Sequence, residues 1–239
     1  MRTQEQKNTQ MQENTQMQKQ TRMKKKTVIL FDLDGTLTDP GVGITRSVNY
    51  ALESFGINTE DLNELCKFIG PPLIESFVKY YGFDETQALL GVEKYREYFK
   101  DIGIFENEPY QGIDEILHHL SVTGKRLIVA TSKPKVFADR ILGHFNLMQY
   151  FDMVCGSELD GTRTKKGEVI MYALDKAGIT DLSEVVMVGD RMHDVIGAKE
   201  SGIDSIGVLF GYGSEGELKS AGATIIVGTV AELKKTLVG

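Results

Sequence analysis

Four short polar segments of this chain carry residue types that could do chemistry. Each either follows an apolar run directly or opens a helical pattern. Taken alone, each has a plain structural interpretation, such as a turn, a helix cap or an exposed helix start. Their occurrence together, in this order, indicates a shared site. The segments are Phe31-Asp32-Leu33-Asp34-Gly35-Thr36-Leu37, Val129-Ala130-Thr131-Ser132-Lys133-Pro134, the pair Lys165-Lys166, and Val188-Gly189-Asp190-Arg191-Met192-His193-Asp194.

The chemistry that these residue types suggest is phosphoryl transfer. Asp32 and Asp34 stand two residues apart at a strand end, and Gly35 permits a turn there, so both carboxylates can face one ligand. Asp32 and Asp190 would form an oxygen-rich site of the kind that Mg²⁺ prefers. A threonine, a backbone N–H and a lysine from the other segments would hold phosphate oxygens. A nucleophilic aspartate would then form an aspartyl-phosphate, which water hydrolyses.

The elements that must position these residues alternate between short apolar strands and helical patterns. This alternation, with nearly continuous apolar strands, predicts an α/β fold: a Rossmann-like parallel sheet covered on both faces. Ligands bind such a sheet outside the carboxyl ends of its strands, where the polar segments would converge. The predicted strands are Thr27–Phe31, Arg126–Ala130, Met153–Cys155, Val185–Val188, Ser205–Leu209 and Thr224–Val227, and the predicted helices are Gly112–Val122, Val136–Phe145, Glu168–Ala177, Asp194–Ser201 and Ala231–Leu237.

The alternation fails between residues 40 and 110, where only helical patterns occur. A normal crossover needs only about 10–12 residues, so this stretch is interpreted as an inserted helical cap on a core formed by residues 23–39 and 111–239. Proline and glycine at both connections could form a hinge. The predicted cap helices are Ile44–Phe55, Leu62–Ile69, Leu73–Tyr80, Thr86–Leu90 and Val92–Lys100.

The first 22 residues differ in composition from the rest of the chain. They are rich in glutamine, and Asn-Thr-Gln-Met-Gln occurs twice, at 8–12 and 14–18. Such a segment has too little apolar surface to offset the entropy of ordering. We therefore expect residues 1–22 to be a disordered or weakly helical tail outside the fold.

Composition bounds the partners and the compartment. A net charge of −7 argues against binding to a nucleic-acid polymer or to an anionic membrane surface. Two cysteines, Cys66 and Cys155, fit a reducing compartment, and no apolar run approaches the ~20 residues that span a bilayer. We expect a cytoplasmic monomer or weak dimer that acts on a small molecule.

With these motifs the chain resembles the haloacid dehalogenase (HAD) superfamily of phosphohydrolases, from Met23 to about Leu237. Residues 32–36 match its Asp-x-Asp-Gly-Thr motif and residues 189–194 match Gly-Asp-x-x-x-Asp. The resemblance implies a nucleophile, a general acid and base that also gives its backbone carbonyl to Mg²⁺, and a phosphate-binding lysine. Either lysine of the pair could serve, and Lys-x-Glu-Val-Ile at 166–170, which resembles the family's helix start, favours the second. The implied catalytic residues are, in motif order, Asp32, Asp34, Thr131 and Lys166; the substrate-binding residues are Gly35, Thr36 and Ser132; and the metal ligands are Asp32, Asp34, Asp190 and Asp194.

Further motifs resemble the phosphoglycolate-phosphatase-like branch of the superfamily, which includes 5′-nucleotidases. The resemblance implies a nucleoside 5′-monophosphate or phosphoglycolate as substrate. The acid at position 34 favours a phosphatase or a phosphomutase over a dehalogenase, because it can protonate a leaving alcohol. A sugar-phosphate phosphomutase therefore remains an alternative, and a non-enzymatic phospho-receiver is a remote one. The motifs are Ile69-Gly70-Pro71-Pro72-Leu73, the segments 130–134 and 159–163, and Gly207-Val208-Leu209-Phe210-Gly211-Tyr212-Gly213.

Overall fold

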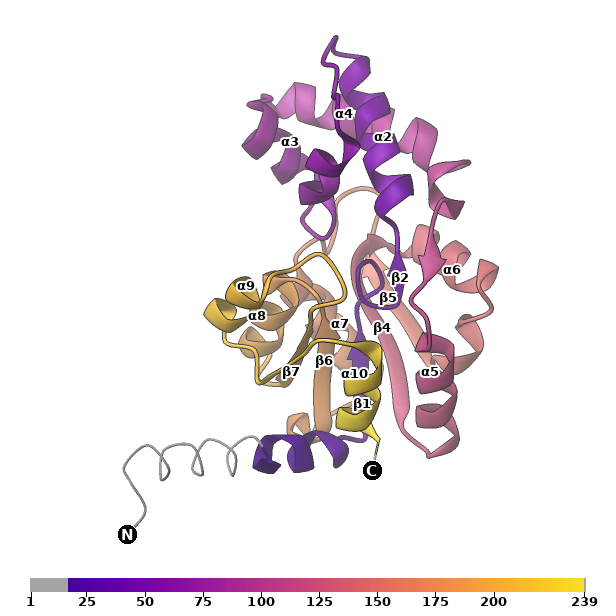
Figure 1. The fold of residues 1–239 in the computed structure, drawn as a ribbon, viewed down its shortest axis with the longest axis vertical. Helices are drawn as coiled ribbons and strands as arrows, with labels where there is room; N and C mark the ends of the chain where they lie inside the picture. The colour runs from indigo at the N-terminus through magenta and orange to yellow at the C-terminus, as the bar shows by residue number, and fades with distance from the viewer. Residues whose placement is uncertain (1–16, 239) are drawn as a thin grey trace.

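A six-stranded parallel sheet forms the centre of the protein, which the computed structural model describes over residues 17–238 (Figure 1). The strand order is β5-β4-β1-β6-β7-β8, so β1 is central. From β1 the chain adds β4 and β5 on one side and then crosses to add β6, β7 and β8 on the other, so the order of the strands reverses between β1 and β6. The predicted α/β fold is confirmed. The strands are β1 (Val28–Phe31), β4 (Arg126–Pro134), β5 (Met153–Ser157), β6 (Val185–Gly189), β7 (Asp204–Val208) and β8 (Ile225–Val227).

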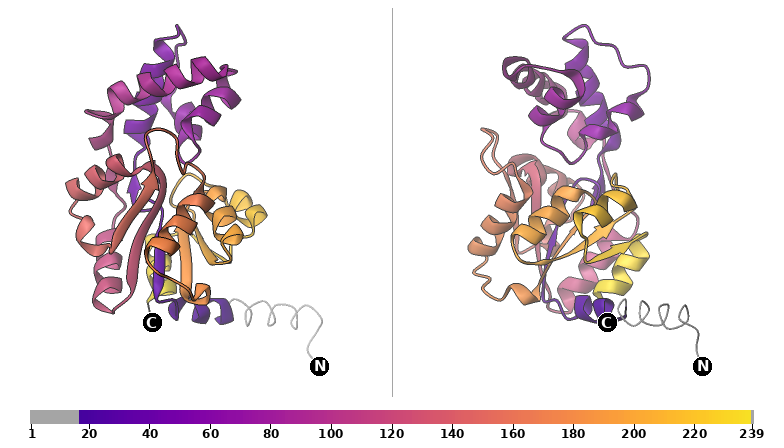
Figure 2. Two further views of the ribbon diagram at one scale, coloured as in Figure 1. Left: turned by 180° about the vertical axis from the view of Figure 1, so that it is seen from behind. Right: turned by 90° about the vertical axis from the view of Figure 1, so that its left-hand side faces the viewer.

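Helices cover both faces of this sheet (Figure 2). All four residues of β1 are buried: Ile29 and Phe31 pack in one apolar cluster with α5, α6 and α10, and Val28 and Leu30 pack in another with α7 and α8. Burial on both faces explains why the strands are continuously apolar. The helices are α5 (Ile113–Val122), α6 (Lys135–His144), α7 (Lys166–Lys176), α8 (Met192–Glu200), α9 (Glu215–Ala221) and α10 (Val230–Leu237).

The helices of residues 41–99 lie together beyond the carboxyl ends of the strands (Figures 1 and 2). They are α2 (Gly41–Glu53), the 3₁₀ helix η1 (Leu62–Phe68), α3 (Leu73–Tyr81) and α4 (Glu85–Phe99). We call this group the cap. It connects to the sheet through two short strands that pair with each other, β2 (Thr38–Asp39) and β3 (Glu108–Pro109), and that were not predicted.

The helices α4 and α9 differ from the sequence-based expectation. The predicted break at Gly91 is wrong, because α4 runs through it, and a Cβ at this position would lie 3.2 Å from the Phe77 ring. Glycine there allows α3 and α4 to pack closely. The helix α9 was not predicted, although Ser214 caps it by accepting the N–H of Glu217.

The N-terminal expectation falls partly outside the described residues, since residues 1–16 are not described. Residues 17–24 are helical, and this helix ends against the core: Met23 is fully buried and Arg22 forms an ion pair with Asp204. Within residues 17–238, no helix is both long enough and apolar enough to cross a membrane.

Candidate active site

The four polar segments meet at the carboxyl ends of the central strands. Asp32 directly follows β1, and its N–H donates to the carbonyl of Val188 in β6 at 2.9 Å. Thr131 lies within β4 on the other side of β1, and Asp190 directly follows β6. Because β1 is flanked by both strands, the side chains that follow them share one space at the point where the strand order reverses.

Lys166, the first residue of α7, lies at the centre of the carboxylates. Its Nζ is 2.7 Å from Asp32 Oδ1 and 2.9 Å from Asp194 Oδ1, and it donates to the Ala130 carbonyl at 3.1 Å. Burial alone would lower the pKa of Lys166, but Asp194 and Asp32 outweigh it and raise the pKa above its usual range. The amine therefore stays charged. Lys165, in contrast, is exposed.

Asp32, Asp190 and Asp194 each place a carboxylate oxygen within 4.8 Å of the others. Burial and the two neighbouring carboxylates raise the pKa of Asp190 well above its usual range. Burial raises the pKa of Asp194 to about 6, although Lys166 opposes the rise. The cluster thus holds more negative charge than the protein neutralises, which a bound cation would correct.

The donor set fits a hard divalent cation such as Mg²⁺. Among residues 17–238, Asp190 Oδ1 is buried without a hydrogen-bond partner, whereas its Oδ2 accepts the N–H of Tyr212 at 2.8 Å. Asp194 is the third residue of α8; its Oδ2 accepts the N–H of Arg191 at 3.0 Å and its Oδ1 faces Lys166. Asp190 is therefore the best placed of the three to offer an oxygen, whereas Asp32 and Asp194 each also contact Lys166.

Gly35 allows the first and fourth segments to approach each other. It has φ +80°, and a Cβ built there would lie 2.3 Å from Asp190 Oδ2. A side chain at this position would therefore displace the Asp190 carboxylate.

Asp34 points to a different partner from Asp32. Its Oδ2 lies 2.9 Å from Lys133 Nζ, and within the described part of the chain its buried Oδ1 accepts no hydrogen bond. Burial raises the pKa of Asp34 above its usual range, although Lys133 opposes the rise. A carboxyl group of this kind can carry a proton at a higher pH than an exposed aspartate, which suits a general acid.

The remaining predicted residues lie around this centre. Thr131 and Ser132 line the cavity described below, and the Thr131 hydroxyl accepts the N–H of Lys133 at 3.2 Å. Thr36 is fully buried, and among residues 17–238 its hydroxyl has no hydrogen-bond partner. Thr36 is not among the residues that line the cavity.

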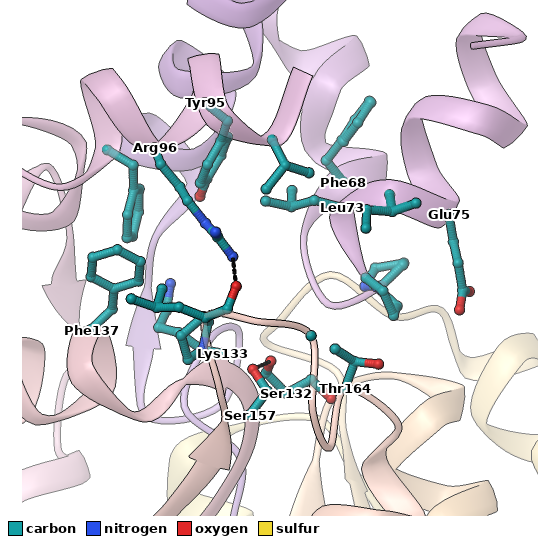
Figure 3. A pocket seen from close by; sticks show the side chains of 18 of the residues that line it. Phe68, Leu73, Glu75, Tyr95, Arg96, Ser132, Lys133, Phe137, Ser157 and Thr164 are labelled. Atoms are coloured by element: carbon teal, nitrogen blue, oxygen red, sulfur yellow. Dashed lines mark hydrogen bonds between the residues drawn. The ribbon is translucent and has the colours of Figure 1, made fainter. Parts of the chain in front are cut away.

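A cavity of about 480 Å³ lies between the cap and the sheet (Figure 3). Asp32, Asp34 and Thr131 lie at its base. Its walls are largely apolar and aromatic; they come from the cap, with Phe68, Leu73, Tyr95 and Phe99, and from the core, with Phe137. From α4, Arg96 reaches across the cavity and donates from Nη2 to the Leu159 carbonyl at 3.1 Å (Figure 3).

Sequence reasoning assigned no role to several residues at this site. Lys133 stands inside a predicted segment, but sequence gives no sign that its amine turns back to Asp34. Arg96 lies far from the four polar segments along the chain, and only folding brings it near. The one available signal in the sequence was that Lys133 directly follows two predicted phosphate-binding residues, Thr131 and Ser132.

Comparison with known proteins supports the predicted superfamily. A family model described as haloacid dehalogenase-like hydrolase matches residues 29–208. A 5′-nucleotidase of Pseudomonas aeruginosa is 50% identical over 209 residues, which are 87% of this chain and 94% of the relative. A Mycobacterium tuberculosis protein named tyrosine-protein kinase PtkA is 38% identical, over 88% of this chain and 72% of its own length.

Solved structures agree as well. The crystal structure of a predicted phosphatase from Clostridium acetobutylicum matches with a TM-score of 0.86 and 51% identity, covering 88% of this chain and 97% of that one. The predicted superfamily and the prediction of a phosphatase are confirmed. The chain belongs to the haloacid dehalogenase-like hydrolases.

Proposed function

We propose that this protein is a Mg²⁺-dependent phosphomonoesterase that works through an aspartyl-phosphate on Asp32, and that its substrate is a nucleoside 5′-monophosphate. The observation that carries the proposal is that the two aspartates after β1 lie in different electrostatic environments. Asp32 lies 2.7 Å from a charged lysine and beside two further carboxylates, whereas burial raises the pKa of Asp34. One is suited to attack and the other to carry a proton.

In the first step, an Asp32 oxygen attacks phosphorus and the bond from phosphorus to the ester oxygen breaks. Asp34 gives its proton to that oxygen, so the alcohol leaves neutral. In the second step, Asp34 takes a proton from water as the water oxygen attacks phosphorus, which releases phosphate and restores both carboxyl groups. Thr131 and Lys166 would bind the phosphate oxygens, and Mg²⁺ held by Asp32, Asp190 and the Asp34 carbonyl would offset the charge between carboxylate and phosphate.

The cavity favours a nucleoside over the two-carbon acid of phosphoglycolate. Its volume is in the range of about 300–1,000 Å³ that small-molecule sites occupy, and its aromatic walls suit a planar base. Four further acidic side chains line it, and they would repel the carboxylate of phosphoglycolate. These are Glu75, Glu93, Glu158 and Asp160.

The test is phosphate release from nucleoside 5′-monophosphates, phosphoglycolate and β-glucose 1-phosphate, each with Mg²⁺ and with a chelator. Asp32→Asn should lower release by more than about 10³-fold, because it removes the nucleophile. Asp152→Asn is the matched control, since Asp152 is 41% exposed and pairs with Arg126 away from the site.

Two results would contradict the proposal. Full turnover by Asp32→Asn would exclude the aspartyl-phosphate, and a preference for phosphoglycolate would exclude the substrate class. Glucose 6-phosphate formed from β-glucose 1-phosphate in place of free phosphate would point to the mutase.

A further inference from the structure

The ammonium group of Lys133 is buried between the Asp34 carboxyl and the cap. Its Nζ lies 2.9 Å from Asp34 Oδ2 on one side and 4.4 Å from the centre of the Phe99 ring on the other. The Lys133 side chain is 6% exposed and that of Asp34 is 12% exposed. A lysine this buried is costly unless it is paired, so the pairing with Asp34 is what makes the position tolerable.

Lys133 is also what orients the Asp34 carboxyl. Within residues 17–238, Oδ1 of Asp34 has no hydrogen-bond partner, and Lys133 supplies the ion pair at Oδ2. A carboxyl group held by one contact turns freely once that contact is lost. General acid catalysis requires the proton within hydrogen-bond reach of the leaving oxygen, so the orientation matters for the reaction.

The cap supplies the other side of this contact. Phe99 is the last residue of α4 and is 2% exposed. Its ring stacks on Tyr95 at 5.1 Å and meets the edge of Phe137, from α6 of the core, at 5.4 Å. In this position the ring covers the Lys133 ammonium, and the attraction between a cation and an aromatic face strengthens when water is excluded.

We propose that Lys133 is a positioning residue: it holds Asp34 in the orientation that protonates the leaving group, and Phe99 of the cap completes this arrangement. The inference rests on the proposed function, in which Asp34 is the general acid. The Phe99 ring can cover Lys133 only when the cap lies over the site, whereas the ion pair between Lys133 and Asp34 lies within the core.

The test compares two esters of the same ring, phenyl phosphate and 4-nitrophenyl phosphate. Phenol is the poorer leaving group and needs the proton, whereas 4-nitrophenolate leaves with little help. Lys133→Met should therefore lower kcat/KM for phenyl phosphate about 10²-fold and for 4-nitrophenyl phosphate less than about 10-fold, because general acid catalysis contributes in this range. Here kcat/KM reports the steps up to formation of the aspartyl-phosphate.

The matched control is Lys135→Met, because Lys135 pairs at 2.5 Å with Asp139 on α6 and is 40% exposed. This variant should leave kcat/KM for both esters within about twofold of the wild-type values. A loss of packing or of phosphate binding would lower kcat/KM for both esters by similar factors, since both present a phosphate on the same phenyl ring. Equal losses in Lys133→Met would overturn the inference.

A second comparison covers the case in which Lys133→Met is poorly folded. In an Asp34→Asn background, Lys133→Met should lower kcat/KM for phenyl phosphate by less than about a further threefold, because a residue that acts through Asp34 has nothing left to orient. If Lys133→Met lowered kcat/KM by the same factor with Asp34 present and with Asp34→Asn, the inference would be overturned. A wild-type enzyme that releases no phosphate from either ester would overturn the proposed function together with it, whereas an unchanged preference in Lys133→Met overturns only the role of Lys133.

Discussion

Gly35→Ala tests whether the close approach of the first and fourth polar segments, at Gly35 and Asp190, sets the geometry of the site. The added Cβ would lie 2.3 Å from Asp190 Oδ2 and 2.6 Å from its Cγ, where ordinary contacts begin near 3.4 Å. The carboxylate must therefore move by roughly 1 Å. A misplacement of ~1 Å in a catalytic arrangement costs on the order of 10²-fold in rate, so we expect phosphate release to fall by about that factor and to need more Mg²⁺.

Gly56→Ala is the matched control for backbone strain. Gly56 has φ +73°, close to the +80° of Gly35, but among the described residues no atom outside its chain neighbours lies within 4 Å of the added Cβ. Both variants place alanine in the left-handed region and should lose about 1–2 kcal/mol of stability. Only Gly35→Ala should also lose activity.

The assay is phosphate release over a range of Mg²⁺ concentrations, with urea unfolding of each variant alongside. If backbone strain is the cost that both variants share, their free energies of unfolding should fall by similar amounts. Any additional loss of activity in Gly35→Ala can then be assigned to the displacement of the Asp190 carboxylate. If Gly35→Ala kept activity within about twofold of Gly56→Ala, the carboxylate would have room to move without effect on the reaction, and the reasoning would be refuted.

Three further predictions concern the cap, the N-terminal contact and the metal. Arg96→Ala removes the hydrogen bond to the Leu159 carbonyl and should raise KM about fivefold with a smaller change in kcat, measured with the best ester; an unchanged KM would contradict it. Burial alone would raise the pKa of Asp204, but Arg22 and Lys26 outweigh it and lower the pKa. This contribution to stability is therefore present above the unfolded pKa of about 3.9 and lost as pH falls through the lower folded value. Asp204→Asn should cost about 1–2 kcal/mol in urea unfolding at pH 7 and much less at pH 3; an equal cost at both would contradict it. Mg²⁺ at 100 times its Kd should add about 2.7 kcal/mol of stability, abolished by chelator; no shift would argue against a preformed metal site.

Sequence predicts best the parts of this fold that depend on local pattern. The strand before Asp32 could be recognised because Val28–Phe31 is apolar on both faces, as a central parallel strand must be. The turn at Gly35 could be anticipated because glycine adopts positive φ without strain. The convergence of the segments then followed from the rule that ligands bind at the carboxyl ends of parallel strands.

The parts that sequence did not predict depend on contacts between distant residues. The pattern around Gly91 suggests a break, but the helix continues because the glycine faces Phe77 of α3. The pairing of Lys133 with Asp34 spans 99 positions and lies under the cap. Nothing in the local pattern around Lys133 shows whether its amine faces solvent or a carboxylate, because a strand end permits both.

The contacts between cap and core differ in how they should respond to cap opening. Tyr212 donates its N–H to Asp190 Oδ2 at 2.8 Å and its hydroxyl to Asp39, which lies in the connecting strand β2. Displacement is smallest near a hinge, so this link can persist while the cap moves. Arg191, in contrast, contacts the carbonyl of Ile69 within the cap itself, and that contact must break. Opening would therefore leave the metal-binding carboxylates in place while it releases the cap side of the site, including the contact of Phe99 with Lys133.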